Sequence, residues 1–485
     1  MDKRFIAFLA ATLTAAVVGL GSAPLASADP DDSGIARANC GPDSSPETGL
    51  QGQVPRRDRD SGRSSRGYWC NMTLIGRYQG EGAGVVSPSY DHCAYFGTIF
   101  PSPLLTVHHG VQVVDAGDEH DPRLSDSLAS TAFLNGTWES LKVDPVHGRL
   151  AGTAVQLPPG VGGLAFDLYS IKDDCAKPRL LNPLAGNLTI PSLVLGHEGG
   201  FAPDGDTYYA SSGTGIITAI SLTDPRHPRT VYTGPVGPTS HGFSISPDGD
   251  TMYGVTLVPG GVQILDISDI QHRRPFPQIR QVGQVSWTDG FFSQHTLNFT
   301  KGDHKYLYSV DEAGIGAVRL IDIDDPTRPE VLREYRLEIQ QPGAARERHE
   351  DFDGNGQFGY DGHYCELNSQ KDPTLLACSY WESGLRLYDI HDLMHPREVA
   401  YYMPPAQTGL ANRLRLRNSA HFFTIGAPPA VDVTDLLNHP TLALPHPRVS
   451  ATTDYCSSPP AFKSDNRLWV TCEDNGFMAL RYHPQ

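Results

Sequence analysis

The sequence predicts an all-β fold made of repeated sheets, and three observations support this prediction. The 485 residues include 49 glycines and 39 prolines, spread along the whole chain, which is too many turn-forming residues for a helix bundle. A short apolar strand that begins with glycine recurs seven times, and a strand–turn–strand hairpin precedes each central copy. With one more strand after each copy, the chain has seven units of four antiparallel strands. This pattern predicts a seven-bladed β-propeller.

The glycine-initiated strand is the third strand of each unit. It often ends in aspartate and is followed by a D-P-x-x-P turn, because proline cannot continue a strand and pre-sets the turn. The seven copies begin at Gly110, Gly163, Gly215, Gly261, Gly316, Gly384 and Gly476. The alternative is a row of small sandwich domains, but the sequence has no linkers between the copies.

The two ends of the repeat array predict how the ring closes. The last unit stops after its third strand, at Tyr482, and an unassigned strand at 71–78 precedes the first unit. We expect this strand to pair with the last blade. The predicted propeller then spans residues 70–485 after an N-terminal extension at 29–69, with a proline-rich insertion at 404–452 between blades six and seven.

Residues 1–28 have the pattern of a cleaved secretory signal peptide. A basic pair precedes an apolar run at 5–20, and a small-residue cleavage site ends at Ala28. A membrane anchor is the alternative, although the run is short for a membrane span. We therefore expect a protein that is secreted, either extracellular or held in the bacterial cell envelope, with no membrane span after cleavage.

Export favours disulfides over free thiols for the eight cysteines. Two pairs flank turns between adjacent strands and are placed for cross-strand disulfides. These pairs are Cys365–Cys378 in blade six and Cys456–Cys472 in blade seven. The spacing leaves the other four open, and a working hypothesis pairs Cys70 with Cys93 and Cys40 with Cys175.

The repeat segments also carry a family resemblance. The stretches at 110–115 (G-V-Q-V-V-D) and 261–269 (G-V-Q-I-L-D-I-S-D) resemble the LVIVD-repeat family of secreted bacterial β-propellers, over residues 70–485. This resemblance implies the fold and says little about activity. More remotely, the histidine pattern is similar to that of the selenium-binding-protein and methanethiol-oxidase propellers, which implies copper and thiol oxidation.

Four histidines hold one register in consecutive blades. His197 and His241 each lie six residues before the proline of a Pro-Asp-Gly turn, and His295 and His363 match them in the next two blades. Because first strands line the channel of a propeller, one residue per blade forms a ring. Imidazoles suit copper, iron, nickel or zinc rather than magnesium or calcium. We predict a four-histidine metal site for copper or iron; the alternative is a duplicated histidine with a structural hydrogen bond.

Two carboxylates fall in the same register in the neighbouring blades. Glu139 in blade two and Asp454 in blade seven are the candidates for catalytic groups or for acceptors that orient the imidazole rings. Glu198 is a weaker candidate for the second role. Blade one offers only small residues at this position, so the predicted ring has histidines on one side and carboxylates beside them.

A second metal site is suggested upstream of His363. The segment 351–357 (D-F-D-G-N-G-Q) matches the first half of a calcium-binding loop. Its candidate ligands for a structural calcium ion are Asp351, Asp353, Asn355 and Asp361. A polar turn between blades is the alternative, because the sequence shows no flanking helix.

Charge and missing motifs narrow the function. A formal net charge of −17 argues against nucleic acid or an anionic membrane as the partner. The sequence has no G-x-S-x-G, H-E-x-x-H or P-loop motif. We expect a monomeric, metal-dependent oxidoreductase that acts on a small molecule. The alternative is a non-catalytic secreted or cell-surface propeller that binds another protein.

Overall fold

The computed structural model describes residues 34–97, 106–154, 165–182, 196–313, 318–351, 358–419 and 452–485. The predicted signal peptide at 1–28 lies outside these residues, so export stays a prediction. Among the described residues, no helix is long and apolar enough to cross a membrane.

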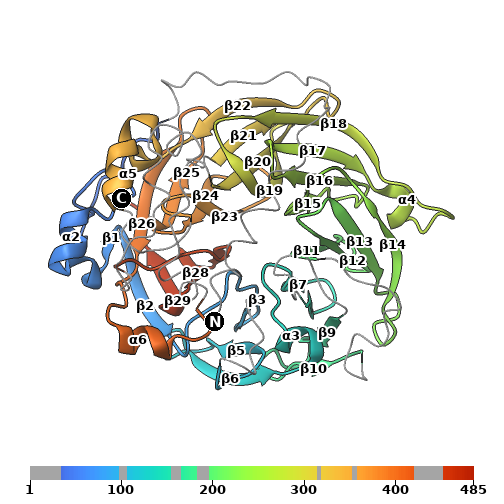
Figure 1. Ribbon diagram of the computed structural model, residues 1–485, viewed down its shortest axis with the longest axis horizontal. Coiled ribbons are helices and arrows are strands. Elements are labelled where there is room, and N and C mark those ends of the chain that lie inside the picture. Colours follow the sequence, from blue (N-terminus) through green and yellow to red (C-terminus); the bar gives the residue numbers. More distant parts are fainter. Residues whose placement is uncertain are drawn as a thin grey trace, which may run out of the picture.

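Seven antiparallel sheets form a ring around a central channel (Figure 1), which confirms the predicted seven-bladed propeller. Blade one contains β3 (Ser89–Tyr90), β4 (Cys93–Phe96), β5 (Val111–Asp115) and β6 (Arg123–Leu128). Blade two contains β7 (Lys142–Asp144), β8 (Arg149–Thr153), β9 (Phe166–Ser170) and β10 (Arg179–Leu180). Blade three contains β11 (Glu198–Phe201), β12 (Thr207–Ser211), β13 (Ile216–Ser221) and β14 (Arg229–Pro235). Blade four contains β15 (Phe243–Ile245), β16 (Thr251–Thr256), β17 (Gly260–Asp266) and β18 (Arg280–Trp287).

The remaining three blades follow the same order. Blade five contains β19 (Phe291–Lys301), β20 (His304–Ala313), β21 (Val318–Asp322) and β22 (Glu330–Tyr335). Blade six contains β23 (Gly362–Leu367), β24 (Leu375–Tyr380), β25 (Gly384–Asp389), β26 (Arg397–Met403) and, as a fifth strand, β1 (Tyr68–Cys70). Blade seven contains β27 (Ala461–Lys463), β28 (Arg467–Cys472), β29 (Gly476–Tyr482) and β2 (Met72–Tyr78).

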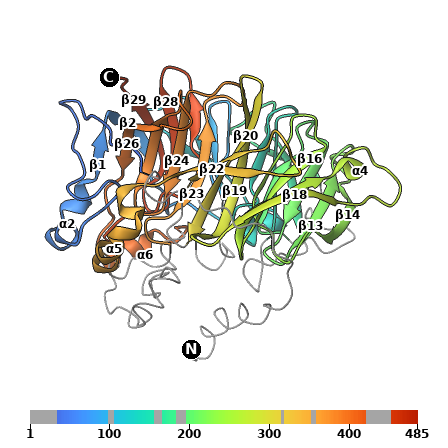
Figure 2. The same cartoon turned by 90° about the horizontal axis from the view of Figure 1, so that it is seen from above.

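The helices of the described residues are short and lie outside the sheets. They are α2 (Arg56–Ser61), η2 (Arg63–Arg66), α3 (Thr131–Leu134), α4 (Ser268–Gln271), η5 (Glu338–Gln340), η6 (Pro342–Ala344), α5 (Ala345–Asp351) and α6 (Leu410–Arg415). Because strands alternate in direction, the connections between blades all leave from one face of the ring. Helices α5 and α6 lie in such connections, and Figure 2 shows them together on one face.

The glycine at the start of the third strand has a steric reason in blades three and six. Gly215 and Gly384 have φ of 76° and 74°, in the left-handed region that favours glycine. A Cβ on Gly215 would lie 2.1 Å from the carbonyl oxygen of Gly237, and one on Gly384 would lie 2.5 Å from that of Tyr402. The third strand therefore begins where the backbone of the fourth strand leaves no room for a side chain.

The ring closes as the sequence predicts. Strand β2 pairs antiparallel with β29, so that Met72 lies opposite Tyr482 and Tyr78 opposite Phe477. Chain segments from both ends of the propeller thus share one sheet. The boundary expected between the extension and the propeller, at 69/70, falls inside β1. Strand β1 pairs with the outer strand β26 of blade six.

Disulfides tie the blades and the extension together. The pairs Cys365–Cys378 and Cys456–Cys472 are confirmed. The working hypothesis for the other four is wrong: Cys40 is bonded to Cys70, and Cys93 to Cys175. The extension folds back beside β1, where Ser45 bridges Trp69, and blade two lies beside blade one. These tertiary contacts decide the pairing, and the spacing in the sequence does not reveal them.

The N-terminal extension is held on blade six by a buried cation. The guanidinium of Arg386 on β25 lies 2.7 Å from a carboxylate oxygen of Glu47 and 2.7 Å from one of Glu398. All three side chains are buried. Buried charges are costly unless they are paired, so this ion triad links the extension to the ring.

Arg386→Met should strongly destabilise the protein, because it leaves Glu47 and Glu398 buried without their partner while keeping most of the side-chain volume. We expect the free energy of unfolding in urea to fall by about 3–5 kcal/mol. The control is Arg37→Met, whose pair with Glu338 is 44% and 39% exposed; it should cost about 1 kcal/mol or less. Equal losses for the two variants would contradict this role of Arg386.

Asp167 should give the protein a pH-dependent stability. Its Oδ2 accepts hydrogen bonds from the backbone amides of Ala132 (2.7 Å) and Phe133 (3.3 Å) at the start of α3. Burial raises the pKa of Asp167 to about 6, although these hydrogen bonds oppose the shift. The folded state therefore binds a proton more tightly than the unfolded state. The stability that this provides is present below about pH 4 and is lost as pH rises toward 6.

The variant Asp167→Asn keeps the acceptor and removes the ionisation. The difference in unfolding free energy, variant minus wild type, should be more favourable at pH 7 than at pH 4 by up to about 3 kcal/mol. Urea unfolding at a series of pH values measures this difference. Parallel pH profiles for the two proteins would show that the ionisation of Asp167 does not contribute.

Candidate metal centre

The four histidines lie at the channel, near the start of the first strand of each blade. His197 lies one residue before β11 and His241 two residues before β15, whereas His295 lies in β19 and His363 in β23. Figure 1 shows these first strands nearest to the centre of the ring. His363 is completely buried, and His197 retains 14% of its side-chain exposure. The site is therefore enclosed and is most open on the side of His197.

Three of the four histidines surround the carboxylate of Glu139. Its Oε2 lies 2.9 Å from Nε2 of His197 and 3.4 Å from Nε2 of His241. Its Oε1 lies 2.8 Å from Nε2 of His363. Glu139 precedes the first strand of blade two and is placed by a backbone bridge to Glu198 of blade three. Four blades thus meet at one buried carboxylate.

Sequence reasoning missed a second carboxylate, Glu312. Its Oε2 lies 3.1 Å from Nε2 of His363. It belongs to β20, a second strand, and so lies outside the register that relates the first strands. One signal could have found it: Asp311 and Glu312 are consecutive acids in the buried half of β20, and charges at such positions need partners.

His295 is not part of this group. Its Nε2 lies 3.3 Å from the backbone nitrogen and 3.4 Å from the carbonyl oxygen of Cys365. Its Nδ1 is buried and has no hydrogen-bond partner among the described residues. Burial, together with the nearby charges of Lys142 and His363, lowers the pKa of His295 to about 3. The ring is therefore neutral.

A β-bulge explains why His295 differs from His363. In blade six the unpaired extra residue between β23 and β24 is His363, whereas in blade five the extra residue between β19 and β20 is Gln294. His295 is therefore the structural equivalent of Tyr364. A one-residue shift turns a side chain to the other face of a strand, so equal spacing in the sequence does not give equal orientation.

The predicted carboxylate Asp454 has a different place. Its Oδ1 accepts from the backbone amides of Tyr455 and Asp474, and its Oδ2 accepts from the amide and the side chain of Asn475, over 2.7–3.0 Å. These contacts hold the turn between β28 and β29. Among the described residues, neither Asp454 nor His295 belongs to a cluster of metal-ligating atoms within 4.8 Å of one another.

Backbone carbonyls fix the orientation of two of the imidazole rings. His363 Nδ1 lies 2.6 Å from the carbonyl oxygen of Ser457, and His241 Nδ1 lies 3.2 Å from that of Gln294. A carbonyl only accepts, so each Nδ1 carries a proton. Each Nε2 then faces Glu139 in one of two states: protonated as part of an imidazolium, or with a free lone pair that a metal ion can take.

The electrostatics of the group favour an ionised carboxylate. Burial raises the pKa of Glu139, but the charges of His197 and His241 outweigh it and hold the pKa well below its usual range. Burial lowers the pKa of His363, but its hydrogen bonds to Glu139 and Glu312 outweigh this and raise it to about 10. Similarly, Glu139 raises the pKa of His197 against burial. A positive charge is therefore strongly favoured beside Glu139.

A second polar group lies beside the cluster. Tyr364 donates a hydrogen bond to Glu198, whose carboxylate lies 2.5 Å from Nζ of Lys142. The same ammonium lies 5.0 Å from the centre of the Tyr364 ring. Glu198 is therefore compensated by these two residues, and its described contacts do not include a histidine side chain.

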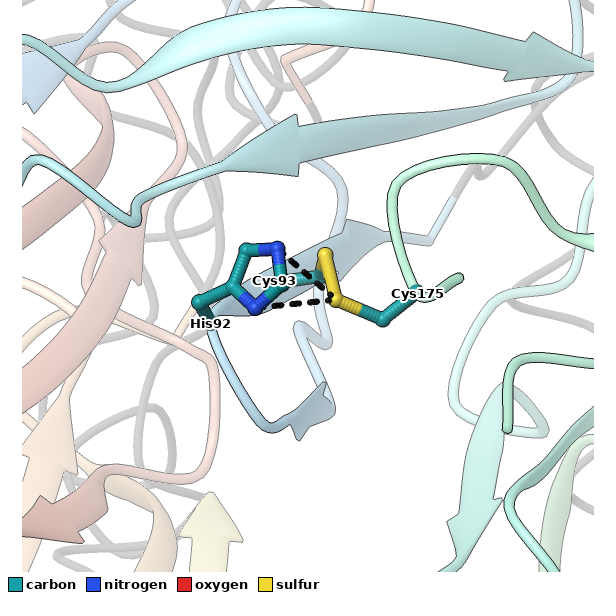
Figure 3. Close-up of side chains that lie close together, drawn as sticks. All are labelled: His92, Cys93 and Cys175. Atoms are coloured by element: carbon teal, nitrogen blue, oxygen red, sulfur yellow. Dashed lines mark hydrogen bonds between the residues drawn. A yellow bond between two sulfur atoms is a disulfide. The ribbon is translucent and has the colours of Figure 1, made fainter. Parts of the chain in front are cut away.

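A third cluster, at the outer turns of blades one and two, contains His92, Cys93 and Cys175. Figure 3 shows the imidazole beside the disulfide, with its nitrogens 3.5 and 3.6 Å from Sγ of Cys175. Metal binding by cysteine needs thiolates. Because both sulfurs are in a disulfide, this cluster is not a metal site in this structure.

Asp351, the first of the four predicted calcium ligands, contacts other groups of the protein. The carboxylate of Asp351 accepts from Gln53 Nε2 (2.8 Å), the backbone amide of Arg56 (2.7 Å) and the hydroxyl of Tyr360 (2.9 Å). Asp351 thus anchors the N-terminal extension, and calcium binding by this segment stays a prediction. Asp361 precedes β23, and its carbonyl accepts from the amide of Trp381. Asp353 and Asn355 lie outside the described residues.

Comparisons with known proteins concern the fold. No family model and no curated protein matches the chain, so membership of the LVIVD-repeat family stays a prediction. The chain is similar to a hydrazine synthase from Kuenenia stuttgartiensis, with 12% identity and a TM-score of 0.49 over 84% of this chain and 98% of that one. It is also similar to a periplasmic gluconolactonase from Pseudomonas aeruginosa, with 15% identity and a TM-score of 0.47 over 64% and 82%.

Proposed function

We propose that the protein is a secreted, metal-dependent oxidoreductase that uses copper or iron in its channel to oxidise a small molecule. The candidate ligands are Glu139, with Nε2 of His197 and His241 beside its Oε2, and Nε2 of His363 beside its Oε1. One observation carries the proposal: buried imidazoles from three blades point their Nε2 atoms at one buried carboxylate. His295 and Asp454, expected at the site from the sequence, are left out of the ligand set.

The residues fit a metal ion. Glu139 Oε2 is buried and accepts no aligned hydrogen bond from a described residue, although two imidazole nitrogens lie within 3.4 Å. Two ligand atoms that share an ion at about 2.1 Å are about 3.0–3.4 Å apart. The separations around Glu139, 2.8–3.4 Å, are close to this range. Without a cation, the same arrangement places three imidazole nitrogens against one buried carboxylate.

The donor set limits the choice of metal. Imidazole nitrogens with one or two carboxylates suit copper, iron or zinc, whereas magnesium and calcium prefer a shell of oxygen atoms. Copper or iron supplies one-electron redox chemistry when bound. Because of this redox chemistry, the proposed enzyme is an oxidoreductase and not a hydrolase.

The surrounding residues orient the ligands and limit access. Carbonyls hold the rings of His241 and His363 at Nδ1, and the rings of Trp138 and Trp381 lie 4.8 and 4.4 Å from those of His197 and His363. The partly exposed side chains at the site are His197 and Lys142. A substrate would approach on their side, and the enclosure favours a small molecule.

The disulfides of the protein agree with a secreted enzyme. All eight cysteines are paired in four disulfides, which form and persist in oxidising environments. This fits an extracellular or periplasmic protein.

Metal analysis of the purified full-length protein, after reconstitution with Cu(II) or anaerobically with Fe(II), tests the proposal. The wild type should retain at least one equivalent through gel filtration. Glu139→Ala should retain less than a tenth of this amount, because it removes the ligand that all three histidines share. His295→Ala is the matched control, an imidazole removed from the same channel, and it should retain the wild-type amount.

Circular dichroism and thermal unfolding show whether each variant is folded. A folded wild type that binds neither metal would overturn the proposal and would favour the non-catalytic interaction propeller. Equal losses for Glu139→Ala and His295→Ala would instead restore the four-histidine ligand set expected from the sequence.

A further inference from the structure

We propose that Glu139 bridges two metal ions, one on each carboxylate oxygen, so that the channel holds a dinuclear centre. This inference rests on the proposed function, because it assumes that the cluster binds metal at all. It goes beyond that function in the number of ions, in the role of Glu139 and in the assignment of Glu312 as a ligand.

The ligand atoms fall into two groups that share only Glu139. The first group, site A, contains Glu139, His197 and His241; the second, site B, contains Glu139, Glu312 and His363. Within each group the ligand atoms all lie within 4.8 Å of one another. The two histidines of site A contact Oε2, whereas His363 of site B contacts Oε1. A carboxylate that offers a different oxygen to each group has the geometry of a bridging ligand.

The distances within each group suit one ion per group. In site B, Nε2 of His363 lies 2.8 Å from Glu139 and 3.1 Å from Glu312. In site A, the two nitrogens lie 2.9 and 3.4 Å from Oε2. Each group has three ligand atoms, which leaves positions for a bridging or terminal oxygen ligand. Two-metal sites in proteins hold their ions about 3.5–4 Å apart, a span that one carboxylate covers.

The charges also favour a second cation. Glu139 and Glu312 are both buried, and both face the same nitrogen of His363. In contrast, Glu198 beside them has Lys142 and Tyr364 as partners. A single ion at site A would leave Glu139 Oε1 and Glu312 to share one nitrogen of His363. An ion at site B gives both carboxylates a cation and lets Nε2 of His363 act as a ligand while Nδ1 keeps its hydrogen bond to Ser457.

The two sites differ in their chemistry. Site A provides two nitrogens and one oxygen, whereas site B provides one nitrogen and two oxygens. Nitrogen-rich sites favour copper, and carboxylate-rich sites favour harder ions such as iron or manganese. We therefore expect the two ions to bind with different affinities and the two sites to be emptied separately by mutation.

Metal counting on the full-length protein, loaded with Cu(II), tests the bridge. The wild type should bind two equivalents. His241→Ala removes a ligand of site A only, and Glu312→Gln removes a ligand of site B only, so each should bind one equivalent. The double variant should bind less than a tenth of the wild-type amount. The matched control is Glu198→Gln, a buried channel carboxylate outside both groups, which should keep two equivalents.

Electron paramagnetic resonance gives a second readout that does not depend on activity. Two Cu(II) ions bridged by a carboxylate lie close enough to interact magnetically, so the wild-type spectrum should show dipolar broadening and a half-field transition. In Glu312→Gln both features should be absent. A wild-type spectrum that shows neither feature would overturn the bridge.

The outcomes separate this inference from the proposed function. A wild type that binds one equivalent, lost in Glu139→Ala but kept in Glu312→Gln, would leave the metal enzyme standing and refute the dinuclear centre. A folded wild type that binds no metal would refute both. Folding of each variant is checked by thermal unfolding before the metal is counted.

Discussion

Closure of the ring is the constraint on which the rest of the structure depends. Seven sheets form a closed circle only because β2, from the N-terminal side, completes the sheet that ends with β29. Closure fixes the first strand of every blade at the channel. Residues that are far apart in the chain, such as Glu139 and His363, then meet at the axis without any direct sequence relation. Residues that share one register in the repeats therefore lie at the channel. Their side chains point to the same place only if the strands have the same local geometry.

The second constraint is the pairing of buried charge. Arg386 is neutralised by Glu47 and Glu398, and Arg319 by Asp311. Arg59 pairs in the same way with Glu382. These ion pairs join the extension to blade six or brace the interior of blade five, and each charge has a permanent partner. The cluster around Glu139 differs, because its carboxylates face titratable imidazoles. A group that is stable only with added protons or with a bound cation is suited to bind one.

The two faces of the ring contain different kinds of connection between strands. The regular Pro-Asp-Gly and D-P-x-x-P turns lie on one face, together with α4 in the connection between β17 and β18. The connections between blades leave from the other face, and they contain α3, α5 and α6. The histidines lie near the start of the first strands, which is the end that these connections reach. The connections that contain these helices thus lie beside the candidate metal centre. Functional residues are commonly found near the loops of a rigid scaffold.

Much of the fold is determined by the sequence itself. The glycine-initiated strands, the closing strand at 71–78 and two of the four disulfides could be predicted, because they depend on local spacing and on repetition. The register that places His197, His241 and Glu139 at the channel is equally local. Tertiary structure alone decided that Cys93 bonds to Cys175, since this needs the contact between two blades. It also turned His295 away through a bulge at Gln294, drew Asp454 into a turn and brought Glu312 from a second strand to His363. The physical reason is that a sequence register counts residues, whereas a site requires side chains to point at one place, and bulges and neighbouring blades set that direction.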